Sequence, residues 1–514
     1  MNNNNAPAAI RSLIIFAACI ALAVCIGYLL AMPADRGTFG FGGILLLIFL
    51  TPILLRWHHF LLIAGWNFSM TIFFLPGTPP VWLLLTAISL GISILHRTIN
   101  SRAQFLHAPE ITWPILFFLA VILFTAKMTG GIGLHSFGNA TSGGKKYVTI
   151  LFGIVAYFAL TAQRIPAARV KLYIALFFLA GFSRAIGDLA AYLPRGFNFI
   201  FAFFPPSGYN MESSIGSMNF NARYAGLGAL GSAGVFMMLA CYGVRGILLT
   251  GKPWRWVLFG LFIFCVPLGG FRSGVLGVVL VFTCLFFLER VYRTTLMPVF
   301  IFAGLIAVTL LIPFSEKLPF NFQRSLSFLP IKISTAARMD ADASKEWRLE
   351  LWRQAYPLVP EYLLLGRGYR ISAGDLEQST NPIFQAGKER EAQIISGDFH
   401  SGPLSVIIPF GIWGVIAVLW LWIAGLRALY LNFRYGDPSF RVFNTFLLAS
   451  FISSIVMFLF IFGGIEGDLA NYVSILGLSI SINGGIRRPV PVTQTSMAVP
   501  AAPPRPRFQP FLQR

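Results

Sequence analysis

Two side chains just before a long apolar stretch could carry out acid–base chemistry. His400 lies at the mouth of this stretch, and Asp398 stands two residues earlier. An imidazole titrates near neutral pH and can act as a general base. A lone histidine in such a place is ordinarily a helix cap or an interfacial residue. Asp398 is placed equally well to orient His400 or to cap the next helix.

Three arginines lie where they could bind an anion at the edge of an apolar stretch. Arg272 interrupts a glycine-rich turn between two such stretches, and Arg223 begins another. Arg348 shares a stripe with Trp352 on a helix predicted over 340–356, which Asp342 or Ser344 would cap. A guanidinium forms paired, charge-assisted hydrogen bonds with phosphate oxygens. The ordinary alternative for each arginine is snorkelling to the interface.

The composition shows what kind of element must hold these residues. Of the 514 residues, 56% are hydrophobic and 11% are charged, and the mean hydropathy is +0.73. Soluble proteins carry about 25% charged residues, so a soluble enzyme, a disordered chain and a nucleic-acid-binding domain are excluded. All five cysteines lie in apolar runs, which argues against a disulfide scaffold. The sequence predicts an all-α polytopic membrane protein.

Hydropathy gives fourteen candidate spans, and because several are short, the predicted number is twelve to fourteen transmembrane helices. The first is interpreted as a retained helix rather than a cleaved signal peptide. The approximate limits are 10–31, 39–55, 58–76, 79–95, 112–126, 146–163, 171–190, 222–243, 254–270, 273–290, 296–313, 403–427, 440–463 and 467–485.

The distribution of basic residues predicts which side of the membrane each loop faces. With a cytoplasmic N-terminus, the short inner loops carry 14 Lys and Arg residues and the short outer loops carry 7. This bias follows the positive-inside rule, and the net charge of +20 therefore reports topology. Both termini are predicted to be cytoplasmic. The predicted regions are 1–313 with eleven helices, an outer loop at 314–402, the last helices at 403–485, and a basic, proline-rich tail at 486–514.

The outer loop at 314–402 differs from the other loops in length and charge. It spans 89 residues and holds 11 acidic and 11 basic residues, so it is neutral overall. Long loops in compact proteins are usually functional. We therefore expect a small helical cap, with the chemistry on the outer face of the membrane.

The order of these features resembles the O-antigen ligase and polysaccharide polymerase superfamily of bacterial envelope proteins. The resemblance covers roughly 220–425. Family members often have Asn where this chain has Ser401, and Ser where it has Phe271. The matching pieces, in chain order, are Phe271-Arg272-Ser273-Gly274, Trp347-Arg348-Leu349-Glu350-Leu351-Trp352, Leu365-Gly366-Arg367-Gly368, His400 and Pro409-Phe410-Gly411-Ile412-Trp413-Gly414.

The resemblance implies a GT-C-like fold in the bacterial cytoplasmic (inner) membrane and a metal-independent, inverting glycan transfer on its outer face. The donor would be a glycan on undecaprenyl diphosphate, and the acceptor a sugar hydroxyl on lipid A–core or on another glycan chain. His400 would act as the base. Arg272 and Arg348 would bind the diphosphate, with Arg223 as a weaker third, and Asp398 and Trp352 would support them. No cofactor, metal ion or nucleic acid is implied.

Two other interpretations stay open. A metal-dependent lipid-linked glycosyltransferase would use outer carboxylates, for which Asp340 with Asp342, and Asp35, are the candidates. A transporter or flippase for lipid-linked sugars would show related halves and charged residues at mid-membrane, and neither is evident. The sequence does not choose between ligase and polymerase.

Overall fold

The computed structural model describes residues 36–75, 77–100, 105–130, 144–206, 224–294, 296–370 and 389–489, together with part of 13–31. Across these residues the regular secondary structure is helical, and the one exception is an isolated bridge between Thr71 and Pro80. The predicted all-α class is therefore confirmed.

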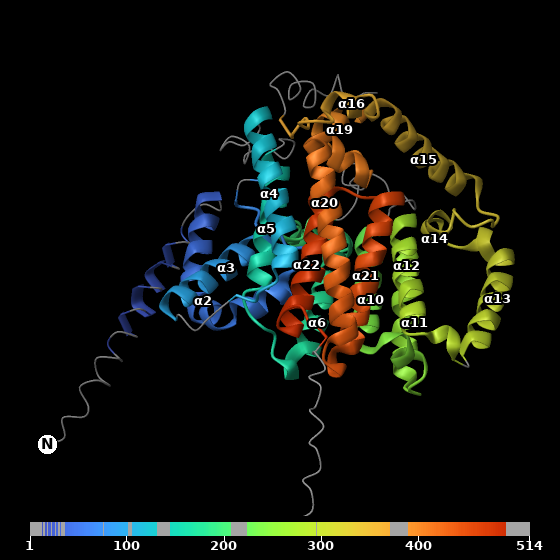
Figure 1. The fold of residues 1–514 in the computed structure, drawn as a ribbon, viewed down its shortest axis with the longest axis horizontal. Helices are drawn as coiled ribbons and strands as arrows, with labels where there is room; N and C mark the ends of the chain where they lie inside the picture. The colour runs from blue at the N-terminus through green and yellow to red at the C-terminus, as the bar shows by residue number, and fades with distance from the viewer. Residues whose placement is uncertain are drawn as a thin grey trace, which may run out of the picture.

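The longer helices stand side by side as a bundle, and short helices lie across one of its ends (Figure 1). The α-helices are α2 (Arg36–Gly65), α3 (Val81–Ile99), α4 (Pro109–Thr129), α5 (Gly144–Leu160), α6 (Val170–Leu179), α7 (Arg184–Ala190), α8 (Ile200–Phe203), α10 (Ala225–Leu248), α11 (Pro253–Leu268), α12 (Arg272–Leu288), α13 (Leu296–Phe314), α14 (Phe320–Ser325), α15 (Thr335–Ala355), α16 (Leu358–Tyr362), α19 (Glu389–Ser396), α20 (Gly402–Tyr435), α21 (Arg441–Phe460) and α22 (Ile465–Asn483).

Many of these helices have the length and composition of membrane spans. In the described part of the chain, seven helical segments are long and apolar enough to cross a bilayer, and three shorter apolar helices, among them α11 and α12, lie beside them. The protein is therefore a polytopic membrane protein, as predicted. The number of twelve to fourteen spans and the GT-C-like arrangement stay predictions.

Helix α2 differs from the prediction. Two spans were expected over 39–55 and 58–76, but one helix covers Arg36–Gly65. After this helix, the described residues between 66 and 80 are not helical. Two histidines in the last turns of this helix are satisfied by neighbouring helices. His58 Nδ1 lies 2.9 Å from Ser89 Oγ, and His59 Nε2 lies 2.9 Å from the carbonyl oxygen of Leu160. Because these contacts satisfy the histidines inside the bundle, the helix does not end there.

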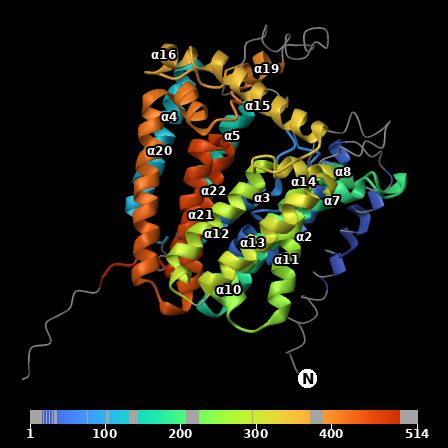
Figure 2. The same ribbon diagram turned by 90° about the vertical axis from the view of Figure 1, so that its right-hand side faces the viewer.

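Helices form within 314–402, the range predicted to be an outer loop, and they are called the cap below. Helices α14, α15, α16 and α19 come from residues 314–402 and lie across the end of the bundle where α12 and α22 begin (Figures 1 and 2). Helix α15 begins earlier than predicted, at Thr335 rather than 340, because Ser334 caps it by accepting a hydrogen bond from the backbone of Ala337. The predicted caps Asp342 and Ser344 lie inside the helix.

A break in helix α20 joins the cap to the membrane helices. Gly411 has φ +62° and ψ −159°, which is not helical, and it follows Pro409. The backbone groups released by this break pair with the loop after α16. The bonds run from Arg367 N to Ile408 O (2.8 Å), from Gly368 N to Pro409 O (3.0 Å), and from Ile412 N to Leu363 O (2.7 Å). Two of the motif pieces seen in the sequence therefore bind each other.

We expect Gly411→Ala to lower the free energy of unfolding by about 1–3 kcal/mol from backbone strain alone. Its positive φ costs about that much for a residue with a Cβ, and the new Cβ would stand 2.7 Å from the carbonyl oxygen of Leu363. Thermal unfolding in detergent measures the effect. Gly260→Ala is the matched control because its Cβ would meet nothing within 4 Å. Equal melting temperatures for the two variants would show that the break does not need glycine.

Candidate active site

The segment 397–401 holds His400 between the cap and the membrane helices. The indole Nε1–H of Trp352 on α15 donates to the carbonyl oxygen of Phe399 at 2.9 Å. Phe399 is almost fully buried and packs with Ala355 and with Leu404 at the start of α20. Trp352 therefore holds the backbone of the segment that carries His400, and its supporting role in catalysis stays a prediction.

His400 has an unusual backbone and aromatic neighbours. Its φ of +48° is in the left-handed region, which is uncommon for a residue other than glycine. Its ring centroid lies 5.5 Å from that of Trp347 on α15 and 5.4 Å from that of Phe462, in the turn before α22. The side chain is 17% exposed. Such strained positions occur often at functional sites.

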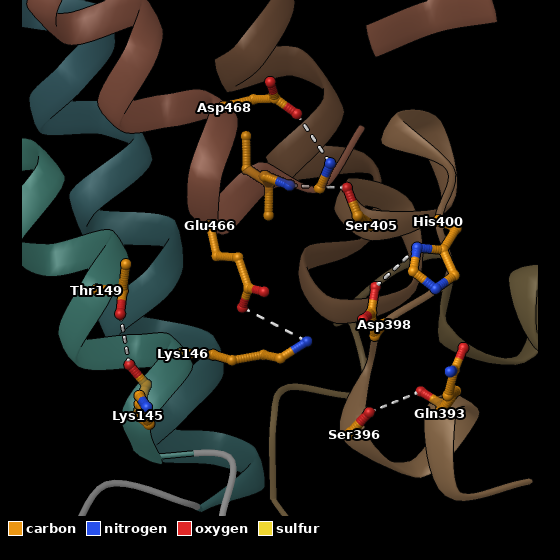
Figure 3. Close-up of polar contacts among 12 residues, drawn as sticks. Lys145, Lys146, Thr149, Gln393, Ser396, Asp398, His400, Ser405, Glu466 and Asp468 are labelled. Carbon is orange, nitrogen blue, oxygen red and sulfur yellow. Dashed lines mark hydrogen bonds and ion pairs between the residues drawn. The ribbon is translucent and has the colours of Figure 1, made fainter. Parts of the chain in front are cut away.

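The electrostatic surroundings keep the His400 imidazole neutral. Burial lowers the pKa of His400 below its usual 6.5; Asp398 opposes this shift, and Arg348 and Lys146 add to it. A neutral imidazole at pH 7 can accept a proton, as a general base must. Asp398 Oδ1 lies 3.6 Å from His400 Nδ1, which is longer than a hydrogen bond (Figure 3).

Asp398 does not cap the following helix. Helix α20 begins at Gly402 with Ser401 in the N-cap position, and no side chain caps it. The carboxylate instead faces His400 (Figure 3). Of the two roles left open for Asp398, this geometry favours the one beside the imidazole.

Arg348 lies in the same neighbourhood as His400. Its guanidinium carbon is 5.6 Å from the centre of the Phe462 ring, which also contacts His400. The positive charge of Arg348 contributes to the lowered pKa of His400. Because one aromatic ring contacts both side chains, the structure brings the predicted base and one predicted cation together.

Arg272 approaches α15 at a different point. As the first residue of α12, it donates from Nη2 to the carbonyl oxygen of Ala341 at 3.2 Å. Ala341 precedes Arg348 by seven residues, which is about 10 Å along the helix axis. Arg272 lines a polar cavity of about 340 Å³ with two further cations, Lys332 and Arg338. Arg272 therefore contacts the cap helix that carries Arg348, but two turns before Arg348. Arg223 lies outside the described residues.

An ion pair near His400 was missed by the sequence reasoning. Lys146, at the start of α5, lies 3.4 Å from Glu466 in the first turn of α22. Lys146 had been counted only as a charge that reports topology. Because the two residues are about 320 positions apart, no local sequence pattern predicts that they form a pair. The sequence shows only that both lie at the outer ends of predicted spans.

One carboxylate of the metal-dependent alternative, that of Asp340, forms an ion pair. Asp340 Oδ2 pairs with Arg324 Nε at 2.8 Å. Within the described ranges, no three His, Cys, Asp or Glu side chains are grouped so that they could hold a metal ion. Asp35 lies outside those ranges. The described groups around His400 are charged side chains and aromatic rings rather than a cluster of metal ligands.

These features define a polytopic helical membrane protein with a cap over a histidine–arginine site. Residues 256–419 match the family model described as O-antigen ligase. The matched segment runs from α11 into α20 and contains Arg272, Arg348 and His400. Among curated proteins, none matches the chain. The match confirms the resemblance to the O-antigen ligase and polymerase superfamily, whose members transfer glycans in polysaccharide biosynthesis.

Proposed function

We propose that the protein transfers a glycan from an undecaprenyl diphosphate carrier to a sugar hydroxyl on the outer face of the bacterial cytoplasmic membrane. The acceptor is lipid A–core or another glycan chain. The single observation that carries this proposal is the meeting of His400 and Arg348 at the Phe462 ring, inside the segment that matches the O-antigen ligase model.

The reaction is a direct displacement at the anomeric carbon. The acceptor oxygen forms a bond to this carbon, the bond from the carbon to the diphosphate breaks, and His400 takes the hydroxyl proton. Negative charge develops on the leaving diphosphate, and Arg348 stabilises it through charge-assisted hydrogen bonds. Arg272 contacts the diphosphate from the start of α12, and Arg223 is a weaker third contact. Asp398 and Trp352 keep the imidazole in position.

The location of the site suits a lipid-linked donor. The donor's tail must stay in the bilayer while its diphosphate lies at the water boundary. The cap crosses the end of the bundle at which α12, α20 and α22 begin, so its side chains would meet the diphosphate there (Figure 2). We assign this end to the extracytoplasmic side and both termini to the cytoplasm, in line with the charge bias of the loops.

The decisive experiment is transfer by the purified protein. A lipid-linked glycan is incubated with lipid A–core or with a second glycan chain, and the product is resolved by gel and mass spectrometry. We expect transfer to one acceptor, at the same rate with and without EDTA, because no step uses a metal ion. Loss of activity in EDTA that Mg²⁺ or Mn²⁺ restores would support the metal-dependent alternative. Movement of intact donor across a bilayer without a new glycosidic linkage would support a flippase.

A further inference from the structure

A lysine on an element not yet assigned to the site lies close to His400. Lys146 is in the first turn of α5, and its side chain is 17% exposed, whereas the neighbouring Lys145 is exposed. Its ammonium lies 5.7 Å from the centre of the Tyr369 ring in the cap. A lysine is seldom buried to this extent without a reason, since removing an ammonium from water is costly.

Glu466 holds the Lys146 ammonium in place. The two charges are 3.4 Å apart, and the turn that carries Glu466 is itself fixed. The backbone of Ile465 donates to Ser405 Oγ on α20 at 3.0 Å, and that of Gly464 donates to Asp468 at 2.8 Å. The position of the ammonium is therefore set by α22 and α20 as well as by α5.

The Lys146 side chain extends toward the reacting groups. Figure 3 shows it leaving α5 and crossing the space between Glu466 and the segment with Asp398 and His400. Its charge reaches the imidazole, because it contributes to the lowered pKa of His400. Arg348 acts on the same imidazole from α15. Two cations on separate elements, Lys146 and Arg348, therefore act on the electrostatics of the base.

Helix stability does not explain this lysine. Cations are favoured at helix C-termini and disfavoured at N-termini, yet α5 begins with two lysines and has no acidic residue in its first turn. A charge that is unfavourable for its own helix, mostly buried and held beside a base is better explained by a ligand of opposite charge.

We propose that Lys146 binds the anionic diphosphate of the lipid-linked donor, opposite Arg348, and that Glu466 positions its ammonium. This inference rests on the proposed function, since it names a further binding residue of the same site. Lysine offers a compact charge with three donors, whereas arginine offers a planar fork. Lys146 and Arg348 would therefore bind the diphosphate with different hydrogen-bonding geometries. When the donor binds, Lys146 would exchange part of its contact with Glu466 for contacts with the phosphate oxygens.

Binding of undecaprenyl diphosphate to the full-length protein in nanodiscs tests the proposal, with uncharged undecaprenol as the second probe. We expect Lys146→Gln to weaken binding of the diphosphate about tenfold, the loss of roughly one charge-assisted hydrogen bond, and to leave undecaprenol binding unchanged. Lys145→Gln is the matched control, because it removes the same charge one residue away at an exposed position. We expect it to bind like the wild type, and Lys146→Arg to recover most of the affinity.

Equal affinity of Lys146→Gln and Lys145→Gln for the diphosphate would overturn the proposal and leave Lys146 as a structural ion-pair partner. Because Lys146→Gln leaves Glu466 unpaired, the double variant Lys146→Gln/Glu466→Gln removes both charges and keeps the test valid if the single variant unfolds. The double variant should also bind the diphosphate weakly. The assay contains no acceptor, so failure of wild-type glycan transfer contradicts the proposed function without affecting this result.

Discussion

Replacing His400 with alanine should reduce glycan transfer by about 10²–10⁴-fold, which is the usual contribution of a general base. The hydroxyl of the acceptor then has no group to take its proton as it attacks. The initial rate of transfer by purified protein measures this effect. Membrane insertion and abundance should stay normal, since His400 lies in the segment before α20 and is not part of its helical hydrogen bonding.

The pH profile provides an independent check on His400. Burial lowers its pKa below 6.5, so the base is mostly unprotonated at neutral pH, and activity should fall as the pH decreases through that lowered value. The residual activity of His400→Ala should lack this acid limb. His107→Ala, at an exposed histidine in a predicted inner loop, should behave like the wild type. Full activity in His400→Ala would remove the residue from the mechanism.

Replacing Arg348 with alanine should lower transfer on the order of 10²-fold or more, because the developing charge on the leaving diphosphate loses the guanidinium that we propose stabilises it. Arg348→Lys should recover only part of the rate, since an ammonium lacks the planar fork. Rates at saturating donor measure the effect on the chemical step, and rates at low donor also include its binding.

Arg353 gives a matched control for Arg348 on the same helix. Its side chain is 77% exposed and pairs with Glu350 at 3.2 Å. Arg353→Ala should therefore keep the wild-type rate. Equal losses in Arg348→Ala and Arg353→Ala would mean that transfer depends on the cap as a whole rather than on a guanidinium beside His400.

The class of protein and the cap could be predicted because they depend on local patterns. Apolar runs predict membrane helices. The stripe that contains Arg348 and Trp352 predicted helix α15, and the predicted end at 356 is one residue from the observed end. Its start was predicted incorrectly, since several residues near it could serve as a cap and only the packed structure selects Ser334. The prediction of two spans over 39–76 was also wrong, because it could not foresee contacts with other helices. Ser89 and Leu160 contact His58 and His59 and keep these histidines inside the bundle.

The arrangement of the site depends on contacts between distant residues. Hydropathy places Arg272 and Arg348 at the same membrane boundary, but only the fold shows that Arg272 contacts α15 two turns before Arg348, which is part of that helix. The pair of Lys146 and Glu466 has no sequence signature at all. The roles of His400, Arg348 and Arg272 stay predictions until the variants are measured.

The break at Gly411 has a consequence for building hybrid proteins. The loop after α16 supplies hydrogen-bond partners for residues 408–412. The turns of α20 before Gly411 are therefore held by the cap as well as by the rest of their own helix. A chimera that exchanges only the outer loop at 314–402 would separate these partners. A chimera that exchanges 314–414 keeps these hydrogen bonds within one exchanged piece, so it should unfold at a higher temperature in detergent than the chimera that exchanges 314–402.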